Sequence, residues 1–200
     1  MHTETVIYQH RGLKFYGYLA REDSQEKKPV VLVVHDWTGR NTLACEKAEM
    51  LARMGYIGFA VDMYGEGRLG NTTEEKQALM SPLMSDREDL LARMNAALNV
   101  VRSIPGVDAH RVASIGFCFG GLCALDLARS GADIKGVVSF HGLLHRPEKL
   151  VSHKIKAKIL ALSGYDDPMV PPEQVNHFCQ EMTAAGADWQ MNMYEGVTPL

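Results

Sequence analysis

The strongest constraint on the fold is the alternation of uninterrupted apolar runs with segments of helical periodicity. Residues 29–35 read PVVLVVH, a β-branched run that is typical of a strand covered on both faces. A helical period begins at Thr42 and is predicted to end at Gly55. Its apolar stripe consists of Leu43, Met50, Leu51 and Met54.

The same alternation continues along the rest of the chain. Further strands are predicted at IGFAVDMY, RVASIGF, KGVVSFHG, KAKILALSG and DWQMNMY. Helices are predicted over 90–104, over GGLCALDLARSG, and around Phe178 and Met182. Strands that alternate with helices form a mainly parallel sheet with helices on both faces, so we predict an α/β fold. VIYQHRG and LKFYGYLA are predicted to pair as an antiparallel hairpin at one edge.

Composition narrows the classes of function. The chain has 200 residues, 46% of them hydrophobic, and a formal charge of −3, which suits one domain over residues 1–200 with a sizeable core. Lys and Arg form no basic stripe of the kind that a phosphate backbone requires. No signal-peptide pattern and no bilayer-spanning stretch is found. We therefore expect a cytoplasmic protein without nucleic-acid or membrane partners, and its oligomeric state is left open.

Cysteine and histidine spacing argues against a metal site. The four cysteines contain no CxxC pair, and the eight histidines contain no HExxH pattern. We expect all four cysteines to be reduced, and neither a metal nor a cofactor is implied.

The stretch SIGFCFGG at residues 114–121 is the sharpest chemical signal. A strand that leads into G-x-C-x-G-G and an apolar helix matches the nucleophile-elbow pattern, with sulfur in place of a hydroxyl. Gly116 and Gly120 would let helix and strand pack closely, which leaves Cys118 at the crest of the turn. A helix N-terminus favours a thiolate, so we expect a lowered thiol pKa. The alternative is that Cys118 is a small buried apolar residue.

Four stretches together resemble the dienelactone hydrolase family of the α/β-hydrolase fold, over nearly the whole chain. They are VVLVVHDWTG, GYIGFAVDMYGEG, GFCFGG, and G-x-x-D-x-x-V-P from Gly164 to Pro171. The resemblance implies a Cys, Asp, His triad in which Cys118 attacks a small lactone or ester and forms a thioester. Asp167 matches the acid of that triad. Asp166 is a weaker match, and one of the pair is also expected to cap the following helix.

The resemblance also implies an oxyanion hole and a supporting carboxylate. The two N–H donors would be those of Phe119 and Trp37, whose ring either lines the pocket or packs against the core. Asp36 matches a Glu that in the family holds or activates the thiol. At close range Asp36 and the thiol would not both ionise cheaply. The alternative for Asp36 is a cap for the helix that begins near Thr42.

The family histidine has no match in the sequence. Its position after the last strand corresponds to Pro199, which cannot shuttle protons. The resemblance therefore implies a chain that is incomplete at its C-terminus and lacks the histidine loop and the final helix. His141, at the end of the strand after the one bearing Cys118, is a weaker candidate for the base.

The sequence leaves the substrate and the exact function open. The family handles lactones or esters that carry a carboxylate, and Arg40, Arg68 and Arg87 are candidate cations or ordinary surface residues. Residues 65–86 are expected to form an irregular cap. Beside the thiol-dependent hydrolase stand a catalytically inactive binding protein of the same fold and a carboxylesterase for other acyl groups.

Overall fold

The computed structural model describes residues 1–147 and 154–196. Their eight strands form one mixed sheet in the order β1-β2-β4-β3-β5-β6-β7-β8. The pairs β1–β2 and β2–β4 are antiparallel and the other neighbours are parallel, which confirms the predicted sheet with its N-terminal hairpin. The bounds are β1 His2–His10, β2 Leu13–Arg21, β3 Lys28–Val34, β4 Ile57–Val61, β5 Val107–Phe117, β6 Gly136–Phe140, β7 Lys158–Gly164 and β8 Asp188–Tyr194.

The register of the parallel strands brings the carboxyl ends of four strands together at one end of the sheet. Val34 pairs with Gly116, and Phe140 pairs with both Phe117 and Leu162. The carboxyl ends of β3, β5, β6 and β7 therefore lie side by side, in the region where open α/β sheets bind their ligands.

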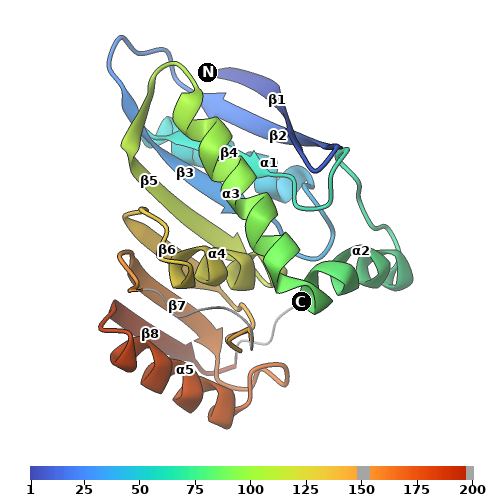
Figure 1. Ribbon diagram of the computed structural model, residues 1–200, viewed down its shortest axis with the longest axis vertical. Helices are drawn as coiled ribbons and strands as arrows, with labels where there is room; N and C mark the ends of the chain where they lie inside the picture. The colour runs from blue at the N-terminus through green and yellow to red at the C-terminus, as the bar shows by residue number, and fades with distance from the viewer. Residues whose placement is uncertain (148–153, 197–200) are drawn as a thin grey trace.

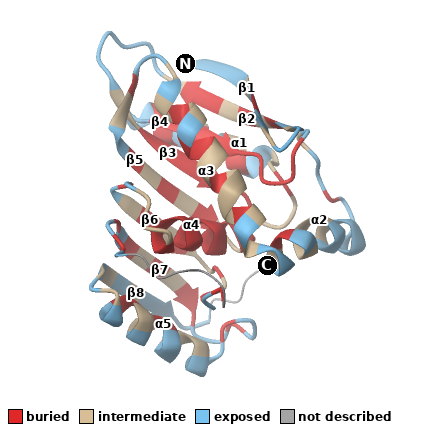
Figure 2. Cartoon of the chain, in the orientation of Figure 1, coloured by how far each residue is buried: buried red, intermediate tan, exposed pale blue. Residues whose placement is uncertain are grey.

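The described residues form five helices, and those that pack on the sheet cover its two faces unequally (Figure 1). Helix α1 packs on β2, β3 and β4 behind the sheet, whereas α3 and α4 pack on the front face. Every residue of α4 is buried, and the helix forms the centre of the larger core cluster (Figure 2). The bounds are α1 Thr42–Arg53, α2 Thr73–Ser85, α3 Arg87–Ser103, α4 Phe119–Arg129 and α5 Pro172–Ala184.

The predicted apolar face of α1 is only partly right, because Leu51 of the stripe is buried and the rest of it is not. Met50 and Met54 are 42% and 63% exposed, whereas Ala44, Ala48 and Ala52 are buried against the sheet. The reason is the close approach of helix and strand: a Cβ at position 58 would collide with the Ala48 carbonyl oxygen. Only small side chains fit at such a contact, so the face of α1 that packs on the sheet consists of alanines together with Leu51.

The cap segment is more regular than predicted. It contains α2, which begins with a capping box: Thr72 accepts from the Glu75 N–H at 3.3 Å and Glu75 accepts from the Thr72 N–H at 3.3 Å. The sequence signal was weak because Leu83 is the buried residue of this helix and Pro82 interrupts it. The cap is therefore a loop followed by a helix that projects from the sheet (Figure 1).

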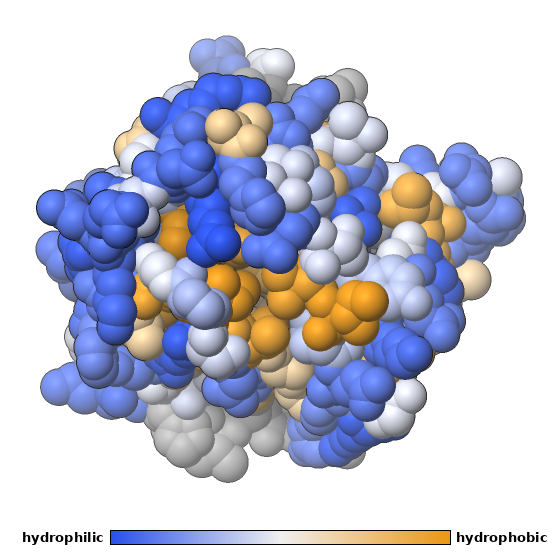
Figure 3. All heavy atoms as spheres, turned by 90° about the horizontal axis from the view of Figure 1, so that it is seen from above, coloured by the Kyte–Doolittle hydropathy of each residue, from blue (hydrophilic) through white to orange (hydrophobic). Residues whose placement is uncertain are grey.

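The face seen from above is mostly hydrophilic (Figure 3). Seen from above, hydrophobic atoms gather in a limited band across the middle of the face (Figure 3). No helix in the described part of the chain is long and apolar enough to cross a membrane.

Candidate active site

Cys118 lies at the turn between β5 and α4, at the carboxyl edge of the sheet. Its backbone has φ 53° and ψ −117°, a conformation that is costly for a residue with a side chain. The glycines permit it, because a Cβ at Gly116 would collide with the Gly120 carbonyl and one at Gly120 with the Val34 carbonyl. The Cys118 N–H donates to the Phe140 carbonyl at 2.9 Å. The half-buried thiol is thereby fixed at the start of α4.

The thiol does not have the lowered pKa that a helix N-terminus led us to expect. Burial is the largest effect and raises the pKa of Cys118, and the carboxylates of Asp36 and Asp167 raise it further. The Phe119 N–H donates to the sulfur and acts in the opposite direction without outweighing these effects. The resting thiol is therefore protonated near neutral pH.

Asp167 lies in the turn after β7 and is 4% exposed. One carboxylate oxygen accepts from the Met169 N–H at 2.8 Å, and the charge is near enough to raise the pKa of the Cys118 thiol. The expectation that one of the two aspartates caps α5 is wrong, because the N-cap is Pro171 and Asp166 is exposed. Cys118 and Asp167 are thus brought together from distant parts of the chain.

Asp36 also lies beside the thiol. Its Oδ1 accepts from the Thr38 N–H at 2.7 Å, and its charge raises the pKa of Cys118. The alternative that it caps α1 is wrong, because Asn41 accepts from the Ala44 N–H at 3.1 Å and is the N-cap. The Asp36 carboxylate therefore lies at the carboxyl end of β3, near enough to the Cys118 sulfur to affect its pKa.

The two predicted oxyanion donors lie on adjacent segments. Phe119 is the first residue of α4, where an N–H has no carbonyl partner within the helix. Trp37 follows β3, and its carbonyl accepts from the Tyr64 hydroxyl at 2.9 Å. The indole ring packs at the border of the core, with the Lys76 ammonium 5.3 Å from the ring centroid. The ring therefore does pack, and it also holds a cation near the site.

The candidate site has no assigned general base. The position that matches the family histidine is Pro199, which lies outside the described residues. His141 follows β6 with a left-handed φ of 41°, and its N–H donates to the Leu162 carbonyl at 2.7 Å. Its Nδ1 is buried and has no hydrogen-bond partner among the described residues. His141 shares the edge of the sheet with Cys118, and its role stays a prediction.

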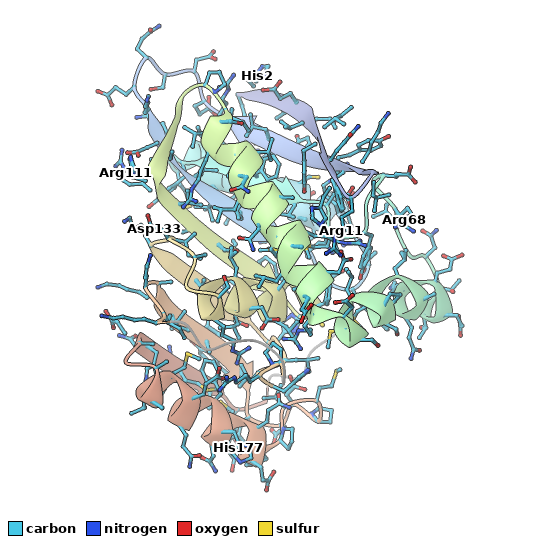
Figure 4. All side chains as sticks on the ribbon, in the orientation of Figure 1. His2, Arg11, Arg68, Arg111, Asp133 and His177 are labelled. Carbon is cyan, nitrogen blue, oxygen red and sulfur yellow. The ribbon has the colours of Figure 1, made fainter. Side chains whose placement is uncertain are left out.

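The three candidate arginines are engaged within the protein. Arg87 binds the buried Asp126 at 2.7 Å, and Arg40 donates to the Cys45 sulfur at 3.3 Å. Arg68 donates to two carbonyls of its own loop, on the side of the molecule that carries α2 (Figure 4). None of these guanidinium groups is presented to Cys118 by a described contact.

Sequence reasoning missed the role of Asp62, a buried carboxylate directly after β4. It accepts from four backbone N–H groups: Tyr16 at 3.0 Å, Tyr64 at 3.1 Å, and Gly65 and Gly67 at 2.8 Å each. The signal was an aspartate between a strand and a Gly-x-Gly turn. Asp62 thereby fixes the loop that carries Tyr64.

In residues 1–147 and 154–196, no group of three or more His, Cys, Asp or Glu side chains is placed to hold a metal ion. The groups available at this end of the sheet are a thiol, two carboxylates, backbone N–H groups and the imidazole of His141.

Residues 15–198 match the model of the dienelactone hydrolase family. The chain is 26% identical to protein usf of Aquifex pyrophilus over 98% of this chain and 85% of that protein. It is 26% identical to a candidate carboxymethylenebutenolidase of Synechocystis, over 97% and 84%. A lactonase candidate of Bradyrhizobium for 2-oxo-3-(5-oxofuran-2-ylidene)propanoate is 28% identical, over 98% and 84%.

The fold is similar to that of solved enzymes of the same kind. The structure of a dienelactone hydrolase-like promiscuous phosphotriesterase from metagenomic libraries superposes with a TM-score of 0.94 at 30% identity, over 98% of this chain and 82% of that one. The family match spans far more than half of the sequence, and the sheet is that of the α/β-hydrolase fold. The chain therefore belongs to the dienelactone hydrolase family, a family of hydrolases that act on ester or lactone bonds.

Proposed function

We propose that this protein is a thiol-dependent hydrolase of small lactones or esters, with Cys118 as its nucleophile. The observation that carries the proposal is the strained backbone of Cys118 at the N-terminus of α4, with the Phe119 N–H directed at its sulfur. Strain of this kind persists where the surrounding structure enforces it, and it clusters at active sites.

The chemistry follows from the groups around the sulfur. The deprotonated sulfur of Cys118 attacks the acyl carbon, a carbon–sulfur bond forms, and the alkoxide oxygen leaves and takes a proton. The N–H groups of Phe119 and Trp37 stabilise the negatively charged oxygen of the tetrahedral intermediate. Water then attacks the thioester, which releases the carboxylic acid and regenerates the thiol. Asp167 would orient the base of this cycle, as in other triads.

The substrates that we propose are compact lactones or esters that carry a carboxylate. Three arginines are engaged elsewhere, and Lys76 is the cation that the structure holds over the Trp37 ring. The name of the Bradyrhizobium relative specifies a lactone with a propanoate group. A carboxylesterase that acts on other acyl substrates is the second candidate, because the phosphotriesterase neighbour is named as promiscuous.

Hydrolysis of p-nitrophenyl acetate and of a dienelactone tests the proposal. We expect Cys118→Ala to lose nearly all turnover, and Asp167→Asn to lose about 100-fold or more. Asp166→Asn is the matched control, because this neighbouring aspartate is exposed. Equal turnover by wild type and Cys118→Ala would reject the proposal.

A catalytically inactive relative is the alternative, and Pro199 at the position of the family histidine is the observation that favours it. The two possibilities differ in a burst experiment with p-nitrophenyl acetate in excess over the protein. A protein with the nucleophile but without the base releases one equivalent of p-nitrophenol slowly and then stops, whereas the hydrolase continues.

We also propose that residues 1–200 form one domain and that the protein is cytoplasmic. The second is supported by the four cysteines, all of which are free.

A further inference from the structure

His35 is a buried histidine that the proposed chemistry does not use. It follows β3 directly and is 1% exposed. Its ring meets Tyr64 edge-on with centroids 4.9 Å apart, and Phe119 lies at 6.2 Å. Tyr64 and Phe119 are themselves stacked at 5.8 Å. Three rings thus fill the space beneath the two loops that carry the candidate oxyanion donors.

The contacts of His35 fix its tautomer. The Met63 N–H donates to Nε2 at 3.2 Å, so this nitrogen carries a lone pair. Nδ1 must then carry the proton, and it donates to the carbonyl oxygen of Asp36. Burial lowers the pKa of His35, which keeps the ring in this neutral form.

The bonded carbonyl belongs to the peptide that joins Asp36 to Trp37. In a trans peptide the C=O and the N–H point in opposite directions. A carbonyl held inward by the buried ring of His35 therefore turns the Trp37 N–H outward, toward the edge of the sheet. The Gly39 N–H reaches the same carbonyl oxygen at 3.4 Å, so the peptide is held from two sides.

Further contacts hold the next peptide, between Trp37 and Thr38, and the backbone around it. The Tyr64 hydroxyl donates to the Trp37 carbonyl at 2.9 Å, and burial raises the Tyr64 pKa, so the hydroxyl keeps its proton. The first turn of α4 abuts this segment, because a Cβ at Gly120 would collide with the Val34 carbonyl and lie 2.5 Å from that of His35. The N–H groups of Phe119 and Trp37 are thereby kept on adjoining backbones.

We propose that His35 is a positioning residue of the oxyanion hole: its Nδ1–H holds the Asp36 carbonyl and so aims the Trp37 N–H at the acyl oxygen on Cys118. This inference rests on the proposed function. It assigns the buried imidazole to orientation of a backbone donor rather than to proton transfer.

Two reactions of the same sulfur separate this role from a structural one. Acylation by p-nitrophenyl acetate develops an oxyanion, whereas alkylation by iodoacetamide does not. We expect His35→Leu to slow acylation of Cys118 by about tenfold or more, since loss of one oxyanion donor costs about 100- to 1,000-fold, while alkylation stays within about twofold. His35→Gln, which keeps a donor and an acceptor, should recover part of the acylation rate.

A control variant and a replacement variant accompany His35→Leu. His177→Gln changes an exposed histidine of α5 and should leave both rates unchanged. If His35→Leu does not fold, as judged by its melting curve, His35→Asn replaces it, because its shorter arm cannot reach both partners. Unchanged acylation, or an equal fall in acylation and alkylation, would overturn the inference alone. Failure of the wild type to be acylated would instead reject the proposed function.

Discussion

Cys118 illustrates how a local pattern determines geometry but not chemistry. The glycines around it predict a sharp turn, and the backbone at Cys118 is left-handed as that pattern requires. Its pKa depends on burial and on Asp36 and Asp167, which come from two other segments of the chain. A motif read from adjacent residues therefore gave the wrong sign for the shift of the thiol pKa.

Asp36→Asn should make the thiol more reactive at a given pH. The carboxylate raises the pKa of Cys118, so its removal lowers that pKa and increases the thiolate fraction below it. We expect the rate of iodoacetamide alkylation at pH 8 to rise by about two- to tenfold, with the half-maximal rate at lower pH. A profile that stays in place or moves to higher pH would contradict the electrostatic account.

Lys76→Gln should change selectivity rather than reactivity. The Lys76 ammonium lies 5.3 Å from the centroid of the Trp37 ring, and under the proposed function we expect it to attract a substrate carboxylate. We expect kcat/KM to fall by about tenfold for an ester that carries a carboxylate and by less than about twofold for its neutral analogue. An equal loss with both esters would argue against a role in recognition of the carboxylate.

At the scale of elements, the sequence predicted the strands, the N-terminal hairpin and most helix positions because their periodicities are local. It failed where two elements approach closely. The stripe of Leu43, Met50 and Met54 is apolar but largely exposed, because contact with Gly58 admits only small residues such as Ala48. It also missed α2, whose capping box at Thr72 was the available signal.

The packing of α1 can be tested by denaturant unfolding. Ala48→Leu should lower the free energy of unfolding by about 1–3 kcal/mol, because the larger side chain has no space at the sheet. Met50→Ala removes more atoms from an exposed position and should change it by less than about 0.5 kcal/mol. The reverse order would show that the methionine stripe is the packed face.

At the scale of the molecule, a buried ionic network joins three helices. Asp126 of α4 is fully buried and binds Arg87 of α3 at 2.7 Å and Arg129 of α4 at 3.2 Å. Arg129 also binds Glu181 of α5 at 2.8 Å. The sequence could not reveal this network because Arg87 and Glu181 lie far from the Asp126 and Arg129 pair in the chain, and each resembles an ordinary surface charge.

Asp126→Ala should therefore destabilise the whole protein. It leaves two buried guanidinium groups without their shared partner, which we expect to cost about 3–5 kcal/mol in thermal or urea unfolding. Lys158→Ala, which removes an exposed pair with Asp188, should cost less than about 0.5 kcal/mol. Similar losses in both variants would contradict the importance of burial.

The most direct test is to expose the protein briefly to p-nitrophenyl acetate, stop the reaction with acid at successive times, and measure the mass of the protein. We predict one acetyl group per chain, located by peptide mapping on Cys118 and absent from Cys118→Ala, while the buried Cys123 stays unmodified. Acetylation at another residue, or none within the time in which p-nitrophenol is released, would contradict a thioester at the crest of the β5–α4 turn.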